Sequence, residues 1–569
     1  MSDQHIPDLS PTAAEQPIST MTGPRRSHGR LGPTAAILVA VALIGTTWLG
    51  VDVVTDDARS VDGDRFAQID HYVADQLNDS RIPGASIVIV EDGAVAHAAG
   101  FGNDGRGNPT TADTPFWIGS NTKSITALAV MQLVEDGVID LDAPAQTYLP
   151  EFRVADPAAS AQITIRQLLN QTSGISRTDG LRAVVDADVN DSIDDVVADM
   201  TDLELNRPAG ERFEYANLNS IVLGAVIEAV TGQSWQDYVE TDIFEPLGMN
   251  DTSTDRLTAD ANGLTATHRF MFGFPVETDA AHYPSLAPTG YVYSTANDIA
   301  RYLTMYLQGG VLDGQRVLGQ VGIDDMLAPA TNERTFALQS QPFTARYGAG
   351  WFVGTFGAAD DARWHQGSLP HFAAWMVLLP DTDQAVVVLL NAGNQFEIGG
   401  ANAAWSRIPQ GVVDLLRGAD PPNGIGAARF FIIFDTLAAL ALIAQAATLI
   451  KVTALRRMPT SITFGHVAPL ALELLLAPLV LIAYPSVAGG LGWGAAFQFV
   501  PDLSFTVLAL AGLAVLTGLA RTSRLLRTRT RPTNEHHPSP TAVEQAASSA
   551  SDIETVDDAQ HPILARYLQ

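Results

Sequence analysis

Apolar positions along the chain separate a long central region from four continuous apolar stretches. In the central region, roughly residues 64–418, two apolar segments at 85–90 and 94–100 are joined by the acidic, glycine-containing turn 91–93. Short apolar segments separated by such a turn predict a β-hairpin. Four more strands are predicted near the end of this region, at 347–354, 362–366, 372–379 and 384–391.

Helices are predicted between these two groups of strands and at both ends of the region. One near 65–78 opens the region, residues 163–325 are largely helical, and another at about 401–417 closes it. Strands at both ends with helices between them predict a mixed fold (α/β, in the α+β arrangement), namely one largely antiparallel sheet flanked by helices, with an inserted helical lobe. Helical spacing of apolar residues is clearest at 218–230, 236–245 and 296–307.

The four apolar stretches predict transmembrane helices, because crossing a bilayer takes about 20 apolar residues. They lie at 34–54, 427–450, 466–484 and 503–520. For the first stretch an uncleaved signal anchor is favoured over a cleaved signal peptide, because a long polar segment precedes it and no clear cleavage site follows. Buried helices of a soluble domain are the alternative for the other three.

Charges that flank these stretches predict their orientation. Lys451 and two arginines follow the second stretch, five arginines follow the fourth, and residues 485–502 contain neither Lys nor Arg. By the positive-inside rule, both termini then lie in the cytoplasm and residues 55–425 lie outside the cytoplasmic membrane. The predicted order is a disordered cytoplasmic segment (1–33), a signal anchor (34–54), a linker (55–63), the soluble domain (64–418), three spans (427–450, 466–484 and 503–520) and a basic, then disordered cytoplasmic tail (521–569).

Composition excludes several classes of function. The net charge of −30 argues against a nucleic-acid-binding surface, because phosphates would be repelled. The chain has no cysteine, which excludes disulfides, thiol catalysis and cysteine-ligated metals. His365 and His371 are six residues apart without a nearby acid at ligand spacing, so neither a metal nor another cofactor is expected.

Lysine is rare, and its position is informative. The chain has two lysines, Lys123 and Lys451, and Lys123 lies three residues after Ser120, where a buried helix is predicted to begin. Residues three apart share a helix face, so the amine can approach the hydroxyl. A buried lysine can lose its proton near neutral pH, whereas arginine cannot. The pattern predicts Ser120 as a nucleophile and Lys123 as its base; the alternative is that Ser120 only caps the helix.

A second motif, Tyr215-Ala216-Asn217, precedes a predicted helix. A phenol close to an ammonium group is expected to have a lowered pKa and to accept a proton. Asn217 is placed to bond both Lys123 and a substrate amide. The alternative is an ordinary helix entry with an aromatic staple.

A third motif, His365-Gln366-Gly367-Ser368, lies in the group of C-terminal strands. Gly367 would let a substrate approach an edge strand closely. The backbone N–H of Ser368 would join that of Ser120 in an oxyanion hole. The alternative for His365 is an ordinary histidine at the end of a strand.

Taken together, these segments resemble the serine β-lactamase and penicillin-binding protein superfamily, on the branch that holds class C β-lactamases, D,D-carboxypeptidases, D-aminopeptidases and related esterases. The resemblance covers about residues 64–417, with the motifs in the family's order. The segments that carry it are Ile82-Pro83-Gly84-Ala85, residues 116–123, Leu168-Leu169-Asn170-Gln171-Thr172-Ser173-Gly174, Tyr215-Ala216-Asn217, Glu245-Pro246-Leu247-Gly248-Met249, Ser294-Thr295-Ala296-Asn297-Asp298 and His365-Gln366-Gly367.

The resemblance implies the family fold and a set of roles. Ser120 would attack a carbonyl and form an acyl-enzyme, and Lys123 and Tyr215 would share the base and acid roles. Asn217 would orient the substrate, with His365 and Gly367 in the substrate-binding strand, and the Ser120 and Ser368 amides would hold the oxyanion. Which of Lys123 and Tyr215 accepts the proton stays open.

Three positions depart from the family pattern. His365 replaces the lysine usual in enzymes that act on penicillins, Gln171 replaces a common histidine, and His371 replaces a common glycine. A histidine is largely neutral above about pH 6.5, so the substrate carboxylate loses a permanent cation there. Peptidase or esterase activity is therefore expected rather than efficient β-lactam hydrolysis.

The sequence thus predicts a membrane-anchored serine hydrolase whose substrate is a small molecule or peptide, such as a cell-wall peptide or a D-amino acid derivative. Its partners are that substrate and the lipid bilayer, with no nucleic acid; protein partners are not indicated. The alternative is a slowly acylating or non-catalytic sensor that signals through the membrane helices. Asp435 and Glu473, two acids inside the apolar stretches, favour this alternative.

Overall fold

The fold was analysed in a computed structural model of the chain. It describes residues 65–332, 334–336, 343–369, 371–393, 403–422, 427–454, 463–487 and 492–529. The predictions for 1–33, 34–54 and 55–63, and for the tail from residue 530, lie outside the described residues.

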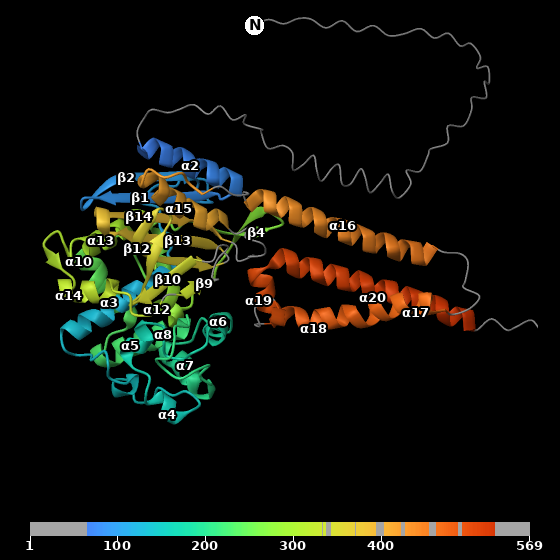
Figure 1. Cartoon of the computed structure of the whole chain (residues 1–569), viewed down its shortest axis with the longest axis horizontal. Coiled ribbons are helices and arrows are strands. Elements are labelled where there is room, and N and C mark those ends of the chain that lie inside the picture. Colours follow the sequence, from blue (N-terminus) through green and yellow to red (C-terminus); the bar gives the residue numbers. More distant parts are fainter. Residues whose placement is uncertain are drawn as a thin grey trace, which may run out of the picture. The chain divides into compact units, whose positions relative to one another are not determined.

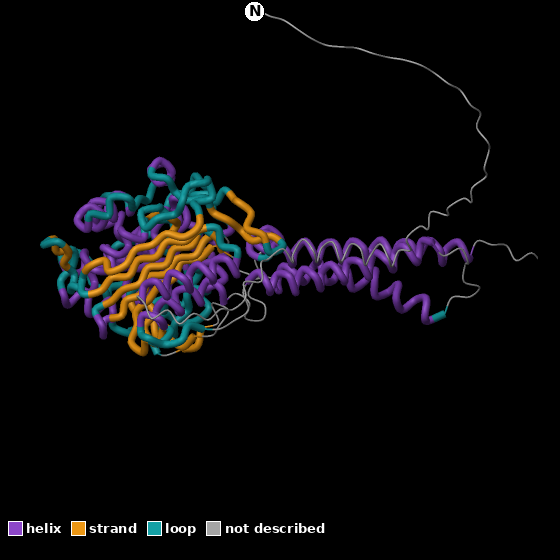
Figure 2. The backbone as a smooth tube through the Cα atoms, turned by 90° about the horizontal axis from the view of Figure 1, so that it is seen from above, coloured by secondary structure: helices purple, strands orange, loops and turns teal. Residues whose placement is uncertain are grey.

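One antiparallel sheet forms the centre of the region from Arg65 to Leu416 (Figures 1 and 2). Its strand order is β2-β1-β14-β13-β12-β11-β10-β9. The first and last parts of the region meet in this sheet, because β1 pairs with β14 in a register that places Ala85 opposite Leu390. The predicted fold class is confirmed. The strands are β1 Gly84–Glu91, β2 Ala94–Gly102, β9 Arg334–Phe336, β10 Phe343–Gly348, β11 Trp351–Phe356, β12 Ala359–Leu369, β13 Phe372–Leu379 and β14 Gln384–Leu390.

Both faces of the sheet are buried, which explains why its central strands are continuous apolar runs. In β1, Ile87 and Ile89 join the apolar cluster on one face, and Val88 and Val90 join the cluster on the other. This alternation follows from the two-residue period of a strand. Helices α2 (Arg65–Ser80) and α15 (Ala403–Leu416) pack on the first face, and α3 (Thr122–Glu135) and α13 (Ala296–Leu307) pack on the second.

One predicted strand is wrong. Residues 347–354 form the end of β10 and most of β11, with a turn at Ala349 and Gly350. Gly350 has φ +82°, and a Cβ there would lie 2.6 Å from the Ser124 Cα. The turn therefore requires glycine because α3 packs directly against it.

The inserted lobe is mainly helical, and two of its strands form a small sheet with a strand from the C-terminal part of the region, which the sequence pattern missed. That sheet consists of β4 (Thr267–Met271), β5 (Phe274–Thr278) and β15 (Ala392–Gly393). The predicted helix 236–245 is divided into α9, a π-helical turn and α10. The remaining helices of this region are α4 Pro157–Ser160, α5 Ile165–Leu169, α6 Arg177–Val185, α7 Ile193–Ala198, α8 Asn217–Thr231, α9 Trp235–Val239, α10 Glu245–Leu247, α11 Arg256–Ala261, α12 Ala287–Gly290 and α14 Gln320–Leu327; short strand pairs are β3 Phe116–Trp117 with β6 Tyr293–Ser294, and β7 Val311–Leu312 with β8 Gln315–Arg316.

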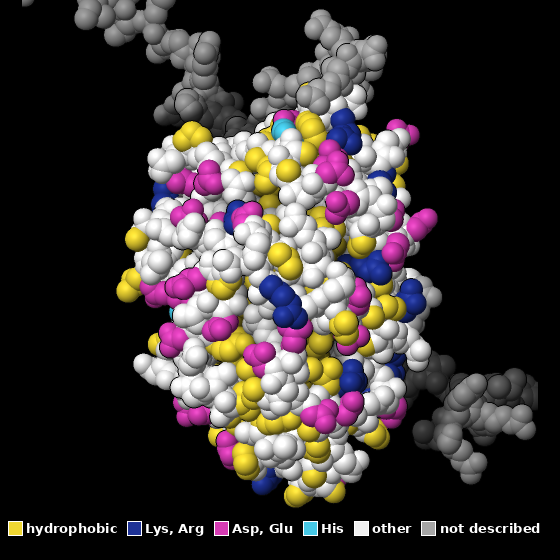
Figure 3. Space-filling view, turned by 90° about the vertical axis from the view of Figure 1, so that its left-hand side faces the viewer, with side chains coloured by type: hydrophobic (Ala, Val, Ile, Leu, Met, Phe, Trp, Pro, Cys, Tyr) yellow, Lys and Arg dark blue, Asp and Glu magenta, His cyan; other side chains and the backbone are white. Residues whose placement is uncertain are grey.

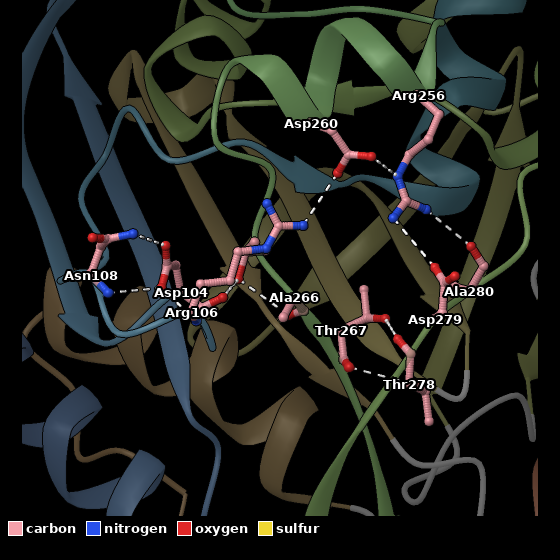
Figure 4. A network of polar contacts seen from close by, with 11 residues as sticks. Asp104, Arg106, Asn108, Arg256, Asp260, Ala266, Thr267, Thr278, Asp279 and Ala280 are labelled. Atoms are coloured by element: carbon pink, nitrogen blue, oxygen red, sulfur yellow. Dashed lines mark hydrogen bonds and ion pairs between the residues drawn. The ribbon is translucent and has the colours of Figure 1, made fainter.

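A polar network fixes α11 to the loop after β2 (Figure 4). Asp260 accepts hydrogen bonds from Arg106 at 3.2 Å and from Arg256 at 2.9 Å. The Arg256 guanidinium also lies over the ring of Trp117, 5.8 Å from its centroid. Since Trp117 is three residues before Ser120, this network stabilises the approach to the predicted nucleophile.

Acidic side chains are spread over the molecular surface rather than gathered in one patch on the face shown in Figure 3, where Lys and Arg side chains lie between them. On this face, the side chains that contribute to the high negative charge of the chain are therefore distributed over the surface. They do not mark a single binding site there.

The C-terminal helices contain three candidate membrane spans, at Phe431–Ala454, Val467–Ser486 and Pro501–Arg527. Each is long and apolar enough to cross a membrane, with a mean hydropathy of 1.9 to 2.1. Glu473 forms an ion pair with Arg521 at 2.9 Å, so this acid has a partner on a neighbouring helix. The helices are α16 Ala427–Ala454, α17 Phe464–Ala471, α18 Ala477–Val487, α19 Gly492–Phe499 and α20 Pro501–Arg529.

Candidate active site

Five of the seven predicted site residues line one cleft between the sheet and the helical lobe. These five are Ser120, Tyr215, Asn217, His365 and Ser368. The other two, Lys123 and Gly367, lie directly behind its wall. The fold thus brings together residues from three distant parts of the chain.

Ser120 lies in a short 3-10 turn, Gly119–Asn121, that leads into α3. The side chain of Lys123 is 2% exposed, and its Nζ lies 3.0 Å from Ser120 Oγ and 2.8 Å from the Thr289 carbonyl oxygen, to which it donates. Burial lowers the pKa of the Lys123 amine well below its usual value near 10.5. A neutral amine next to the hydroxyl has the arrangement required of a general base.

Tyr215 lies on the other side of this pair, in the segment before α8. Its ring centroid is 5.0 Å from Lys123 Nζ, and the phenol is hydrogen-bonded to Ser120. The expectation of a lowered pKa is wrong, because burial raises the pKa of Tyr215 by more than the Ser120 bond and the charge of Arg177 lower it. The protonated form of Lys123, which was expected to lower this pKa, is itself disfavoured by burial.

Asn217 does not bond Lys123, contrary to expectation, because Thr289 stands between them. The Thr289 hydroxyl donates to Asn217 Oδ1 at 3.1 Å, and its carbonyl accepts from Lys123. Asn217 Nδ2 donates to the Gly180 carbonyl at 3.3 Å. Thr289 was missed because α12 is a single turn of four buried residues that carries no periodic signal.

Gln171 positions the Tyr215 motif. It is buried, with φ +58°, and its Oε1 accepts from the Ala216 N–H at 2.8 Å and from Asn219 Nδ2 at 2.7 Å. Its carbonyl also accepts from the Glu214 N–H at 2.8 Å. The Gln171 side chain therefore holds the segment that follows Tyr215, and its backbone carbonyl holds the residue before it.

His365 is buried inside β12 and is neutral. Its Nδ1 lies 2.9 Å from the Gln366 carbonyl, which only accepts, so Nδ1 carries the hydrogen and Nε2 accepts from the Tyr347 hydroxyl at 3.3 Å. Burial, followed by the charge of Lys123, lowers the pKa of His365 to about 3. The third motif therefore places no cation in the cleft at neutral pH.

Gly367 has a different role from the one expected. β12 lies between β13 and β11, so it is not an edge strand. A Cβ at Gly367 would lie 1.9 Å from the Ile118 carbonyl oxygen and 2.9 Å from the Gly119 Cα. Glycine is needed because the turn before Ser120 crosses β12 at this point, which brings Ser120 and Ser368 to the same cleft.

His371 and Arg177 differ in their relation to the cleft. His371 does not line the cleft; its Nδ1 lies 2.8 Å from the Thr278 hydroxyl of β5. Arg177, which the sequence did not single out, is the only charged side chain among the described residues that line the cleft. Within the described ranges, no group of three or more His, Cys, Asp or Glu residues is placed to hold a metal ion.

The chain is similar in sequence to known proteins. Protein flp of Staphylococcus aureus (strain N315) is 28% identical over 338 residues, which cover 58% of this chain and 64% of that protein. Penicillin-binding protein 4 of Amycolatopsis lactamdurans is 30% identical over 322 residues, which cover 55% of this chain and 81% of that protein. The chain thus spans slightly less than two thirds of the staphylococcal relatives that it matches.

Solved structures show the same fold. The octameric penicillin-binding protein homologue from Pyrococcus abyssi superimposes with a TM-score of 0.53 at 24% identity, covering 68% of this chain and 82% of that one. EstCE1, a hydrolase with promiscuous acyltransferase activity, superimposes with a TM-score of 0.52 at 20% identity. The match covers 62% of this chain and 98% of EstCE1.

The family model described as Beta-lactamase matches residues 69–407, which is more than half of the chain. The matched range contains the whole sheet and every predicted site residue. The chain therefore belongs to the beta-lactamase family, within the serine β-lactamase and penicillin-binding protein superfamily.

Proposed function

We propose that the protein is a serine hydrolase that cleaves amide or ester bonds through an acyl-enzyme on Ser120. The observation that carries this proposal is the 3.0 Å contact between Ser120 Oγ and the Nζ of the buried Lys123. A serine hydroxyl is a weak nucleophile at neutral pH and needs such a base. Family membership supports serine hydrolase chemistry in general.

In the first step, Ser120 Oγ attacks the substrate carbonyl while Lys123 takes its proton. The backbone N–H groups of Ser120 and Ser368 stabilise the oxyanion that forms. The bond to the leaving oxygen or nitrogen then breaks, and the proton held by Lys123 passes to that atom. Tyr215, whose phenol stays protonated, relays this proton. Its oxygen accepts the proton from Lys123 while its own proton passes to the leaving atom. In the second step water attacks the acyl carbon while Lys123 takes a proton from it. The bond between that carbon and Ser120 Oγ then breaks, and the proton held by Lys123 returns to Oγ.

The proposal places this site on the outer face of the cytoplasmic membrane. The candidate spans support it, as do the Lys and Arg residues on the loops and tail that would lie inside. The substrates would then be cell-wall peptides or D-amino acid esters. The neutral state of His365 supports a peptidase or esterase rather than an efficient β-lactamase.

Repeated turnover tests the proposal against its alternative, a slowly acylating sensor. Besides Asp435 and Glu473, the structure adds one observation that favours that alternative, a C-terminal helix residue (Phe499) in the cleft wall. The full-length protein in detergent is expected to release product well beyond one equivalent from a panel of nitrocefin, D-amino acid anilides, muropeptides and short-chain esters. A single equivalent of product followed by no further release would contradict the hydrolase.

Arg177 provides a test of substrate charge. As the only formal charge among the described cleft-lining side chains, it is proposed to bind a substrate carboxylate in place of the cation that His365 lacks. Arg177→Gln is expected to lower kcat/KM for mono-4-nitrophenyl succinate by about 10-fold, the weaker end of a charge-assisted hydrogen bond at an exposed position. 4-Nitrophenyl butyrate, with a methyl in place of the carboxylate, is expected to change less than about twofold.

Arg182→Gln is the matched control, because Arg182 lies on the same helix but does not line the cleft. Arg177→Lys is expected to retain most of the preference for the succinate ester. Equal losses on both esters would show that Arg177 does not read substrate charge.

A further inference from the structure

One residue of the active-site cleft comes from the C-terminal helices. Phe499, the last residue of α19, lines the same cleft as Ser120. All other lining residues lie between Gly119 and Leu369. The wall of the cleft is therefore completed by the segment that leads into the candidate span Pro501–Arg527.

This segment is held against the soluble region by specific contacts. Asp502, 2% exposed, accepts a hydrogen bond from the Phe272 N–H at 2.8 Å. The Phe272 ring lies 6.4 Å from that of Phe505 on α20. A second contact stacks Phe270 on Phe431 of α16, with ring centroids 5.7 Å apart. The β4–β5 hairpin thus fixes the position of the helix corner that carries Phe499.

The cleft wall offers other apolar side chains to a substrate besides Phe499. Leu181 and Val184 on α6 and Leu369 at the end of β12 line the cleft as well, and all three are only partly buried. The candidate span begins two residues after Phe499, so the cleft lies next to the end of a helix suited to lipid. The neighbouring hairpin tip is also apolar and exposed, with Phe272 39% and Phe274 50% accessible.

We propose that Phe499, Leu181, Val184 and Leu369 form a subsite for the hydrocarbon part of an amphiphilic ester or amide. The substrate class is then a long-chain or lipid-linked acyl compound presented at a membrane surface. This inference rests on the proposed hydrolase function. The carbonyl of such a substrate reaches Ser120 while its chain lies along the side chains near the membrane helix.

The test compares two esters that differ in chain length, 4-nitrophenyl acetate and 4-nitrophenyl laurate, using full-length protein in dodecyl maltoside micelles. Phe499→Ala is expected to lower kcat/KM for the laurate at least 5-fold, because apolar contact area with the chain is lost, and to change kcat/KM for the acetate less than 2-fold. The laurate-to-acetate ratio is the readout.

Phe497→Ala is the matched control. Phe497 lies on the same helix and packs against Phe505 at 5.0 Å and Trp493 at 5.7 Å, but it does not line the cleft. The inference would be overturned if Phe499→Ala left the ratio unchanged or if Phe497→Ala changed it equally. It would also be overturned if the wild type hydrolysed the acetate but not the laurate. Failure of the wild type to hydrolyse even the acetate would instead contradict the hydrolase function.

Discussion

Replacing Ser120 with alanine is expected to lower turnover of any substrate that the protein hydrolyses by at least about 10³-fold. The acyl-enzyme route depends on a covalent bond to Ser120 Oγ, and the remaining cleft can only bind and polarise the substrate. Covalent labelling by a fluorescent phosphonate should disappear at the same time. The fold should be retained, since Ser120 is only partly buried and removing its hydroxyl leaves the buried α3 intact.

Ser124→Ala is the control for this experiment. Ser124 lies four residues after Ser120, in α3, where its hydroxyl donates to the Asn121 carbonyl at 2.9 Å and accepts from the Tyr302 hydroxyl. It does not line the cleft, so labelling should persist in that variant. Labelling that also persists in Ser120→Ala would remove Ser120 as the nucleophile.

Lys123→Arg is expected to reduce kcat/KM by about 10²- to 10⁴-fold, the range typical of losing a general base. A guanidinium keeps its proton at all accessible pH values and cannot accept one from Ser120. The other lysine supplies the matched control, because Lys451→Arg makes the same change on an exposed part of α16. Comparable losses in both variants would show that the effect is not specific to the site.

The pH profile identifies the base. Burial lowers the pKa of Lys123, so kcat/KM should rise with pH as this amine loses its proton, at a pH well below 10.5. Burial raises the pKa of Tyr215, so its deprotonation should cause no loss below about pH 10. A rise in activity that follows ionisation of Tyr215 instead would assign the base to the phenol.

The same buried lysine is expected to destabilise the folded state. The unfolded chain binds a proton more tightly than the native amine, so the penalty grows as pH falls from near 10.5 to the lowered pKa and is constant below it. Lys123→Met should therefore unfold at a higher temperature than the wild type at pH 7 while losing activity. Thermal unfolding at pH 7 and pH 10 measures this difference, which should shrink at the higher pH.

Much of the fold follows from local patterns. Strands β1, β13 and β14 are recognisable from their long apolar runs, as burial on both sheet faces requires. The largely exposed β2 is recognisable from the turn that joins it to β1. The division of 347–354 into two strands depends on Gly350, whose positive φ marks a turn that an apolar pattern alone does not reveal. The β4–β5 hairpin was missed because one of its strands, β5, is mostly exposed and contains Pro275.

Some residues of the site could likewise be predicted from local spacing, and others could not. Ser120 and Lys123 are three residues apart, so helix geometry alone brings them together. Thr289, Arg177 and Phe499 reach the cleft only through tertiary packing, and no spacing in the sequence relates them to Ser120. The pKa of Tyr215 could not be predicted for a similar reason, since its direction depends on burial rather than on the neighbouring charge.

The order of strands in the sheet has a consequence for how the protein acquires its activity during synthesis. One edge of β1 pairs with β2, the next strand to be synthesised. Its other edge pairs with β14, which is synthesised roughly 300 residues later. Sheets with such distant pairings fold slowly, because a long loop must close before the pairing stabilises it. The turn that carries Ser120 is synthesised long before the strand that carries Gly367. Activity should therefore appear only when the nascent chain has extended past β14 and the last strand has joined the sheet.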